Sequence, residues 1–502
     1  SASAKETSSA KPSASPSASS SASPSASEIK DEAKTTDETS NEEVTTAPEE
    51  AVETEEVDQT TPPEEANTPE ESGSGPVEEV SFDLGGRKVI IGDWNVTDLE
   101  IARLASNAEG ATEQQKAGYQ SLKYQEQKYN CDIEFMKYKK GSNDFVQAAL
   151  AGQHFADAFV TMRHFVFPRV VNMGLLIPLD DYIDFENDPL WVNTNPDAHL
   201  WRGQHYGLRG QVAYAYQGTW INYDVIEKTG VEDPYDLWQA GNWNWETMLD
   251  IALAVTDDTD GDGTTDQWGI IGNDVRYFLY SNGGQVVEYN EATGRYEYAL
   301  NKPNNIRAIQ FWADLNAVHK VVGAGNYSAF AQGIAAFQFN QLWNGERIYE
   351  GGVTNLGWIP FPNGPDVPSD YVTNVRGDMF FLAFPATLPE NERAQVVKVV
   401  ADFLCLWDPS KPYYFPDEKV IDVYMDTNYA MGKFRDWNYV AAKTIAMDNE
   451  TMIGGESRDL QKLLDNDCFN PIANGEKSVV TALESVKAAA TDIVNTRQDL
   501  AE

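Results

Sequence analysis

One short loop carries oxygen-bearing side chains at every second position: Asp258, Asp260, Asp262, Thr264 and Asp266. Carboxylate and carbonyl oxygens are the ligands that Ca²⁺ prefers, and an EF-hand loop supplies them from its first, third, fifth, seventh and ninth positions. Aspartates packed this closely would repel one another without a cation. The spacing therefore predicts a Ca²⁺ site, and the alternative is a solvated acidic turn without metal.

The glycines of this loop favour a structural metal over a regulatory one. Gly263 stands at the sixth position, where an EF-hand loop turns sharply, but Gly269 stands at the twelfth, where such a loop has a bidentate glutamate. Asp266 or a residue elsewhere must then complete the set of ligands. A helix is predicted before the loop, and a strand at 268–270 follows it in place of a second helix. We expect the ion to fix a loop in place.

Flat aromatic faces that stack on sugar C–H groups form a second kind of chemistry that the residue types allow. The chain has 13 Trp, 23 Tyr and 21 Phe, so most of them must be core residues. Trp94 and Asn95 come directly after an apolar strand predicted at 88–92. Open α/β sheets bind ligands at the carboxyl ends of their strands. We therefore expect Trp94 to stack on a ligand and Asn95 to bind its hydroxyl groups, although packing explains the pair equally well.

Other candidate ligand-binding residues are less specific. Asp157 is interpreted as a strand-end residue whose carboxylate accepts hydrogen bonds from ligand hydroxyls or caps a turn. Trp220 and Trp358 are candidates too, although tryptophans in such apolar segments are more often buried in the core. Arg376 and Asp378 precede a buried strand predicted at 379–384 and form either a salt bridge or part of the binding site.

Charge and missing motifs exclude several classes of protein. The net charge of −42 repels phosphate backbones, so no nucleic-acid partner is expected. The sequence has no GxSxG, HExxH or P-loop motif, and its five histidines have no metal-ligand spacing. We therefore expect no enzymatic activity. No apolar run approaches the roughly 20 residues that a membrane-spanning helix needs.

The N-terminal 80 residues differ in kind from the rest of the chain. Residues 1–80 contain no aromatic residue and consist almost entirely of Ser, Ala, Pro, Thr, Glu and Asp. Such a segment cannot bury enough apolar surface to fold, so we expect a disordered tether. The chain begins at Ser1 without a methionine, which indicates a removed targeting segment that ended in a lipidated cysteine. This favours a cell-surface lipoprotein, tethered to the cytoplasmic membrane of a Gram-positive bacterium.

Strand and helix patterns alternate after residue 80. Apolar runs predict strands at 88–92, 132–136, 156–161 and 379–384. Helical spacing is found at 112–129, 144–151, 245–255, 305–321, 392–406 and 478–494. This alternation predicts an α/β fold with parallel sheets, and the roughly 420 residues involved are too many for one core. The sequence therefore predicts two lobes.

The order of several short motifs resembles the family 1 extracellular solute-binding proteins, the maltose-binding-protein-like group. The matching segments are LAGQHFADAFVTM at 150–162, MGLLIPLDDYI at 173–183, GQHYGLRGQVAYAYQGTWINYDVIEKTGVEDP at 203–234, NWNWETMLDIALAVTD at 242–257, FAQGIAAFQFNQLWNGERI at 330–348 and WIPFPNGPD at 358–366. Each motif is short and unspecific, and Arg209 stands where the family usually has proline. Their shared order over about five-sixths of the chain carries the resemblance.

The resemblance implies a two-lobed, periplasmic-binding-protein-like α/β fold of type II. The first lobe would consist of 81–212 and 357–407, and the second lobe of 213–356 and 408–502. Family members place a sugar-stacking tryptophan at the position of Trp343, and the alternative for this residue is a core tryptophan. The two lobes would close on a ligand about a hinge.

The resemblance also implies a function and its partners. The chain would be the extracellular, monomeric substrate-binding component of an ABC importer, with permease subunits as partners and a carbohydrate, most simply an oligosaccharide, as ligand. The aromatic and neutral polar candidates favour sugars over amino acids or peptides, whose termini need fixed charges. Two alternatives stay open: a cell-surface glycan-binding protein without a transporter, and a secreted glycoside hydrolase, which needs a carboxylate pair across a cleft.

Overall fold

The computed structural model describes residues 82–94, 122–139, 144–188, 191, 196–209, 217–341, 344–373, 375–376, 380–405, 446–455 and 457–499. All of them belong to the structural unit formed by residues 78–502. The predicted tether at 1–80 lies outside the described residues. Within the described ranges, no helix combines the length and the apolarity that a membrane crossing requires.

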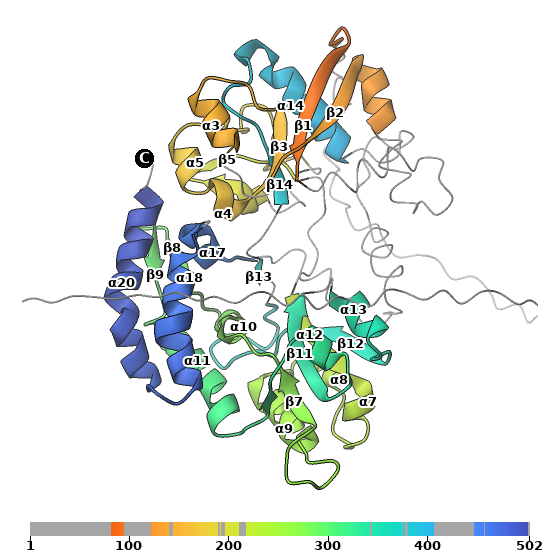
Figure 1. Ribbon diagram of the computed structural model, residues 1–502, viewed down its shortest axis with the longest axis vertical. Helices are drawn as coiled ribbons and strands as arrows, with labels where there is room; N and C mark the ends of the chain where they lie inside the picture. The colour runs from red at the N-terminus through yellow and green to blue at the C-terminus, as the bar shows by residue number, and fades with distance from the viewer. Residues whose placement is uncertain are drawn as a thin grey trace, which may run out of the picture. The chain divides into compact units, whose positions relative to one another are not determined.

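The first lobe is built on a four-stranded sheet in the order β14-β3-β1-β2 (Figure 1). Its strands are β1 (Arg87–Asp93), β2 (Cys131–Lys137), β3 (Ala158–Met162) and β14 (Phe380–Ala383). β1 pairs in parallel with β2 and β3, whereas β14 runs antiparallel to β3. All four predicted strands are confirmed.

Helices cover both faces of this sheet. Side chains alternate between the two faces along each strand, and apolar side chains on both faces pack against helices. Phe159 of β3 packs at 4.3 Å, between ring centroids, against Phe145 of α3 (Asp144–Leu150). On the opposite face, Val89 and Ile91 of β1 share an apolar core with the buried valines of α14 (Glu390–Cys405). Of the helix predicted at 112–129, residues 122–129 are described and helical.

The second lobe has a five-stranded sheet in the order β10-β7-β11-β6-β12. Its strands are β6 (Gln217–Asn222), β7 (Trp268–Ile271), β10 (Val322–Gly323), β11 (Ala335–Gln341) and β12 (Leu356–Ile359). β7 pairs in parallel with β10 and β11, whereas β6 runs antiparallel to β11 and β12. The predicted strand at 268–270 is thus confirmed.

The predicted helices of the second lobe are confirmed as α9 (Trp245–Val255), α11 (Pro303–Ala317) and α20 (Val479–Asp499). A capping box starts α9: the Asn244 side chain accepts from the Thr247 backbone N–H, and the Thr247 hydroxyl accepts from the Asn244 N–H. Gly269 of β7 allows α9 to approach, because a Cβ there would lie 2.5 Å from the Cβ of Ala252.

The remaining elements are short. They are α4 (Arg163–Val166), α5 (Arg169–Asn172), η1 (Pro196–His199), β4 (Leu200–Trp201), β5 (Gln204–His205), α7 (Tyr223–Ile226), α8 (Pro234–Gln239), α10 (Val275–Ser281), β8 (Val287–Asn290), β9 (Arg295–Tyr298), α12 (Tyr327–Phe330), α13 (Gly345–Glu350), β13 (Val375–Arg376), β15 (Ala446–Met447), α17 (Asn449–Gly454), α18 (Asp459–Leu464), η3 (Asp465–Phe469) and α19 (Asn470–Ala473).

The predicted lobe boundary at residue 357 is wrong. β12 pairs with β6 in the second sheet, including Trp358 opposite Trp220. Asp366 is also held in the second lobe, where it accepts hydrogen bonds from Asn282 and Arg307. The chain returns to the first sheet only with β14, so the first lobe resumes after about twenty more residues than expected.

Asp157 is a structural residue of the first lobe. It directly precedes β3, and its carboxylate accepts two hydrogen bonds from the Arg87 guanidinium, at 2.7 and 3.0 Å, and one from the Ile90 backbone N–H. The expectation that Asp157 ends a strand at the binding site is wrong, because five strand residues separate it from the opposite edge, a span of about 16 Å.

We predict that Asp157→Ala lowers the free energy of unfolding by about 2 kcal/mol, because the partly buried Arg87 guanidinium loses its buried, bidentate partner and keeps only the more exposed Glu392. Asp157 is 2 % exposed and Arg87 is 23 % exposed in this pair. Glu134→Ala is the matched control: it breaks the exposed Lys88–Glu134 pair and should cost less than about 0.5 kcal/mol. Urea denaturation measures both losses, and equal losses would contradict the structural role of Asp157.

Candidate functional site

Aromatic side chains gather at the carboxyl edge of the first sheet. Trp94 follows β1, Tyr138 follows β2, and Phe165 lies in α4, directly after β3. Phe380 opens β14, which is antiparallel, so its first residue lies at the same edge, opposite Met162. We call Trp94, Tyr138, Phe165 and Phe380 the edge aromatic cluster.

Trp94 is the centre of this cluster. Its ring centroid lies 5.7 Å from that of Tyr138, 6.1 Å from that of Phe165 and 5.6 Å from that of Phe380. Phe380 is 41 % exposed, and Trp94 is partly exposed. Exposed aromatic faces held by aromatic neighbours form a rigid apolar surface, which suits stacking on a flat ligand.

Of the edge aromatic cluster, Trp94 was predicted from the sequence and the other three members were not. The rule that selected Trp94 applies equally to Tyr138 and Phe165, because each comes shortly after a predicted strand. Phe380 lies within an apolar run that is typical of a buried strand, so the sequence predicted a buried side chain at this position. Its exposure follows from its place at the start of an antiparallel strand, which the sequence pattern does not give.

A pocket of about 430 Å³ lies at the carboxyl edge of the second sheet. Its walls include Asn273 and Asp274, which follow β7, Asn326, which follows β10, and Gln338 and Asn340 near the end of β11. Because β7, β10 and β11 are parallel, their carboxyl ends bring these polar residues together. We call it the second-lobe pocket.

Two amide groups in this pocket lack hydrogen-bond partners among the described residues. They are the Oε1 atom of Gln338 and the Nδ2 atom of Asn273, both buried. Gln338 itself is only 1 % exposed. Buried amide atoms are normally paired, so this acceptor and this donor are candidates for hydrogen bonds with a ligand or with water.

A buried ion cluster closes one side of the pocket. Arg276 of α10 donates to both carboxylate oxygens of Glu450, at 2.6 and 2.7 Å, to Asp465 at 2.9 Å and to Asp274 at 3.3 Å. Burial raises the pKa of Glu450 to about 7, against the opposing effect of Arg276. The cluster ties α10 to α17 and η3 and fixes the wall of the pocket.

Trp220 and Trp358 do not belong to either site. Both are completely buried, and their rings stack at 5.5 Å, between centroids, in the core of the second sheet. The prediction that they bind ligand is wrong, because β6 and β12 are neighbouring strands and turn both indoles inward.

Four predicted site residues stay untested. Trp343, Asn95 and Asp378 lie outside the described residues, although Trp343 follows the last residue of β11, Gln341, by two positions. Arg376 belongs to β13, which pairs in parallel with β15, and its side chain is not described.

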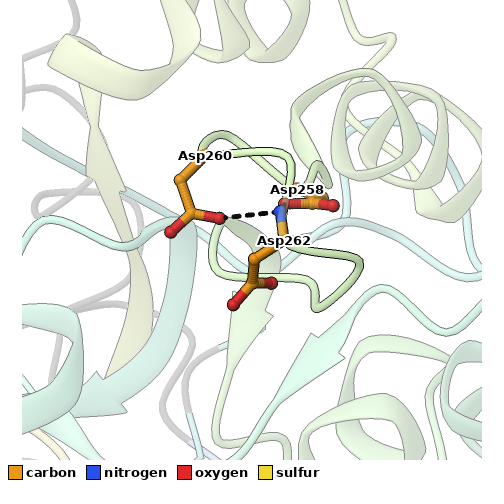
Figure 2. Close-up of side chains that lie close together, drawn as sticks. All are labelled: Asp258, Asp260 and Asp262. Carbon is orange, nitrogen blue, oxygen red and sulfur yellow. Dashed lines mark hydrogen bonds between the residues drawn. The ribbon is translucent and has the colours of Figure 1, made fainter.

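The acidic loop between α9 and β7 brings three of the predicted metal ligands together (Figure 2). Carboxylate oxygens of Asp258, Asp260 and Asp262 lie within 4.8 Å of one another. Asp258 accepts hydrogen bonds from the backbone N–H groups of Gly261 and Gly263, which fold the loop around it. Three converging carboxylates fit the oxygen ligands that Ca²⁺ requires.

The rest of the predicted ligand set departs from an EF-hand. Asp266 accepts hydrogen bonds from the backbone and the hydroxyl of Thr259, and it lies outside the cluster of three. These hydrogen bonds lower the pKa of Asp266. Thr264 donates its backbone N–H to Asp262. Gly269 belongs to β7 against α9, so no side chain fits at the twelfth position.

Two lobes with candidate binding groups at the carboxyl edges of their sheets define the class of two-lobed binding proteins with the periplasmic-binding-protein-like fold. Residues 105–403 match the family described as bacterial extracellular solute-binding protein. The chain belongs to this family, and the resemblance found in its motifs is confirmed.

Solved structures of similar fold come from several bacteria. UspC from M. tuberculosis is 18 % identical with a TM-score of 0.58, over 81 % of this chain and 100 % of that one. An ABC substrate-binding protein from Listeria monocytogenes, in complex with cycloalternan, is 17 % identical with a TM-score of 0.52, over 83 % and 100 %. The GacH receptor of Streptomyces glaucescens, studied with acarbose, is 18 % identical with a TM-score of 0.52, over 84 % and 100 %.

We predict that Trp358→Phe lowers the free energy of unfolding by about 1–3 kcal/mol, because it leaves a cavity beside Trp220 in a closed core. Tyr349→Phe is the matched control, since Tyr349 is 51 % exposed on α13 and its change should stay within about 0.5 kcal/mol. Urea denaturation measures both. A Trp358 variant as stable as the parent protein would contradict the core role of Trp358 and make it a ligand-binding candidate again.

Proposed function

We propose that this protein is the extracellular substrate-binding component of an ABC importer and that it binds a carbohydrate, most simply an oligosaccharide, between its two lobes. The observation that carries the proposal is the pairing of two kinds of group at the two carboxyl edges. One edge presents the edge aromatic cluster, and the other presents a pocket with unpaired, buried amide atoms at Gln338 and Asn273.

These two kinds of group match the two surfaces of a sugar. The C–H face of a pyranose packs on an aromatic ring, while its hydroxyl groups need both donors and acceptors. Phe380 and Trp94 would supply the first contact, and Gln338 and Asn273 the second. The complexes of similar proteins with cycloalternan and with acarbose support a carbohydrate ligand.

The proposal includes the partners and the location of the protein. Permease subunits of the importer would receive the ligand from a monomeric receptor outside the cell. The Ser/Pro-rich, acidic segment 1–80 would act as the tether that holds the receptor at the cell surface as a lipoprotein.

We predict that Phe380→Ala weakens binding of a neutral oligosaccharide about tenfold, because it removes one exposed stacking face. The control is Tyr349→Ala, which removes another exposed aromatic side chain, on α13, and should leave the affinity within about twofold. Calorimetric titration of the full chain with a panel of oligosaccharides measures both affinities.

Three outcomes of this titration would contradict the proposal in different ways. Hydrolysis of a bound sugar would identify a glycoside hydrolase. Binding of polymers without any soluble oligosaccharide would favour a glycan-docking protein that serves no transporter. Binding of peptides or amino acids instead of sugars would keep the receptor role and remove the carbohydrate assignment.

We also propose that the loop at 258–266 binds a structural Ca²⁺. The convergence of Asp258, Asp260 and Asp262 supports this site, and water or backbone oxygens would complete its coordination. The ion would offset the repulsion between carboxylates that the loop holds close together.

We predict that saturating Ca²⁺ raises the midpoint of thermal unfolding by about 3 °C, because the ion binds the loop in the folded protein and not in the unfolded chain. Asp260→Asn should abolish this shift, whereas Asp250→Asn, an exposed aspartate of α9 outside the loop, should preserve it. Differential scanning calorimetry with Ca²⁺ and with a chelator makes the comparison. An unchanged midpoint in the parent protein would identify the loop as a solvated acidic turn.

A further inference from the structure

The charges of the second-lobe pocket are strongly unbalanced. Arg276 is the one cationic side chain among the residues that line it, and Asp274 and Asp465 are the acidic ones. Glu450 lies behind Arg276 and is 2 % exposed. The Arg276 guanidinium thus faces three carboxylates, and each carboxylate has an oxygen within 3.3 Å of a different guanidinium nitrogen.

Arg276 has little capacity left for an anionic ligand. Four of its five N–H groups donate to carboxylates, and both oxygens of Glu450 are bound in the bidentate manner that guanidinium groups favour. Its side chain is only 10 % exposed. A ligand carboxylate or phosphate would have to displace protein carboxylates to reach it.

The two acidic residues of the wall remain open to solvent. The side chain of Asp274 is 45 % exposed and that of Asp465 is 41 % exposed. Glu450 alone would neutralise Arg276, so these two carboxylates exceed what the buried cation requires. With Glu450 protonated the cluster carries a charge of −1, and with Glu450 ionised it carries −2. The wall of the pocket is therefore negative in both states.

The other polar groups of the pocket are neutral. They are side-chain amides, which bind hydroxyl or amine groups without a charge preference, and they belong to Asn273, Asn326, Gln338, Asn340 and Asn470. The sign of the ligand that enters is therefore decided by Asp274 and Asp465.

We propose that the second-lobe pocket selects its sugar by charge: it favours a unit that bears a protonated amine, accepts a neutral unit less tightly, and rejects carboxylated or phosphorylated units. This inference rests on the proposed function and names the class of sugar for that same site. Asp274 and Asp465 pair with the ammonium group, and the neutral amides bind the hydroxyls.

The test uses three monosaccharides that differ in charge: glucosamine, glucose and glucuronate. Titration of the full chain, followed by tryptophan fluorescence and saturation-transfer NMR, is made at mildly acidic pH, where the sugar amine is protonated. At low ionic strength we expect glucosamine to bind about fivefold more tightly than glucose, and glucuronate about fivefold more weakly. Added salt should bring the three affinities together.

Asp274→Asn combined with Asp465→Asn keeps the shape of the wall and removes its negative charge. The ratio of glucosamine to glucose affinity should then fall to about one, and glucuronate should gain affinity relative to glucose. The control Asp459→Asn removes the same charge from α18, where Asp459 pairs with Arg497 outside the pocket, and should keep the parent ratio. Circular dichroism verifies that each variant is folded.

The outcomes separate this inference from the proposed function. Equal affinities for the three sugars in the parent protein, or an unchanged ratio in the double variant, would overturn the charge selection alone. Charge selection is also overturned if none of the three binds while a neutral oligosaccharide does, because the pocket then does not take a single sugar unit by charge. Failure of every carbohydrate to bind would overturn the proposed function as well.

Discussion

Parallel pairing of strands is the constraint on which both halves of the candidate site depend. A strand that runs parallel to its neighbour must end at the same edge, so whatever follows each strand is brought together there regardless of its distance along the chain. In the first lobe this places Trp94, Tyr138 and Phe165 side by side after three strands. In the second lobe it places residues that follow β7 and β10 around the end of β11. The same backbone arrangement thus supplies an apolar surface in one lobe and a polar pocket in the other.

Local patterns were enough to predict the elements and the fold family. Apolar runs and helical spacing located strands such as β1 and helices such as α9, because these depend on which side chains a segment can bury. The rule for strand ends identified Trp94. What the sequence could not give is the pairing between distant segments. β12 joins β6 across more than a hundred residues, and this one pairing both shifts the lobe boundary and buries Trp220 against Trp358. The pocket was missed for the same reason, since its amides come from segments far apart in the chain: the ends of β7, β10 and β11, and α19.

In the acidic loop, local hydrogen bonds determine the first positions of the motif, whereas helix–sheet packing determines the twelfth. Short-range hydrogen bonds to backbone N–H groups fold Asp258, Asp260 and Asp262 around a turn, so their convergence follows from sequence spacing. The twelfth position is decided instead by packing: Gly269 lets α9 rest on β7, and any side chain there would collide with Ala252. The departure from the EF-hand pattern is thus the consequence of a helix–sheet contact.

The late arrival of β14 in the chain has a consequence for synthesis on the ribosome. The first sheet is begun by β1, β2 and β3, yet its edge strand β14 and the helix α14 follow only after every strand of the second sheet has been made. Until residues 380–405 emerge, β3 has an unpaired edge and one face of the sheet lacks the valines of α14. The N-terminal lobe therefore cannot be completed until the strands of the second sheet have been made, and the nascent chain must keep that edge from pairing with other chains during translation.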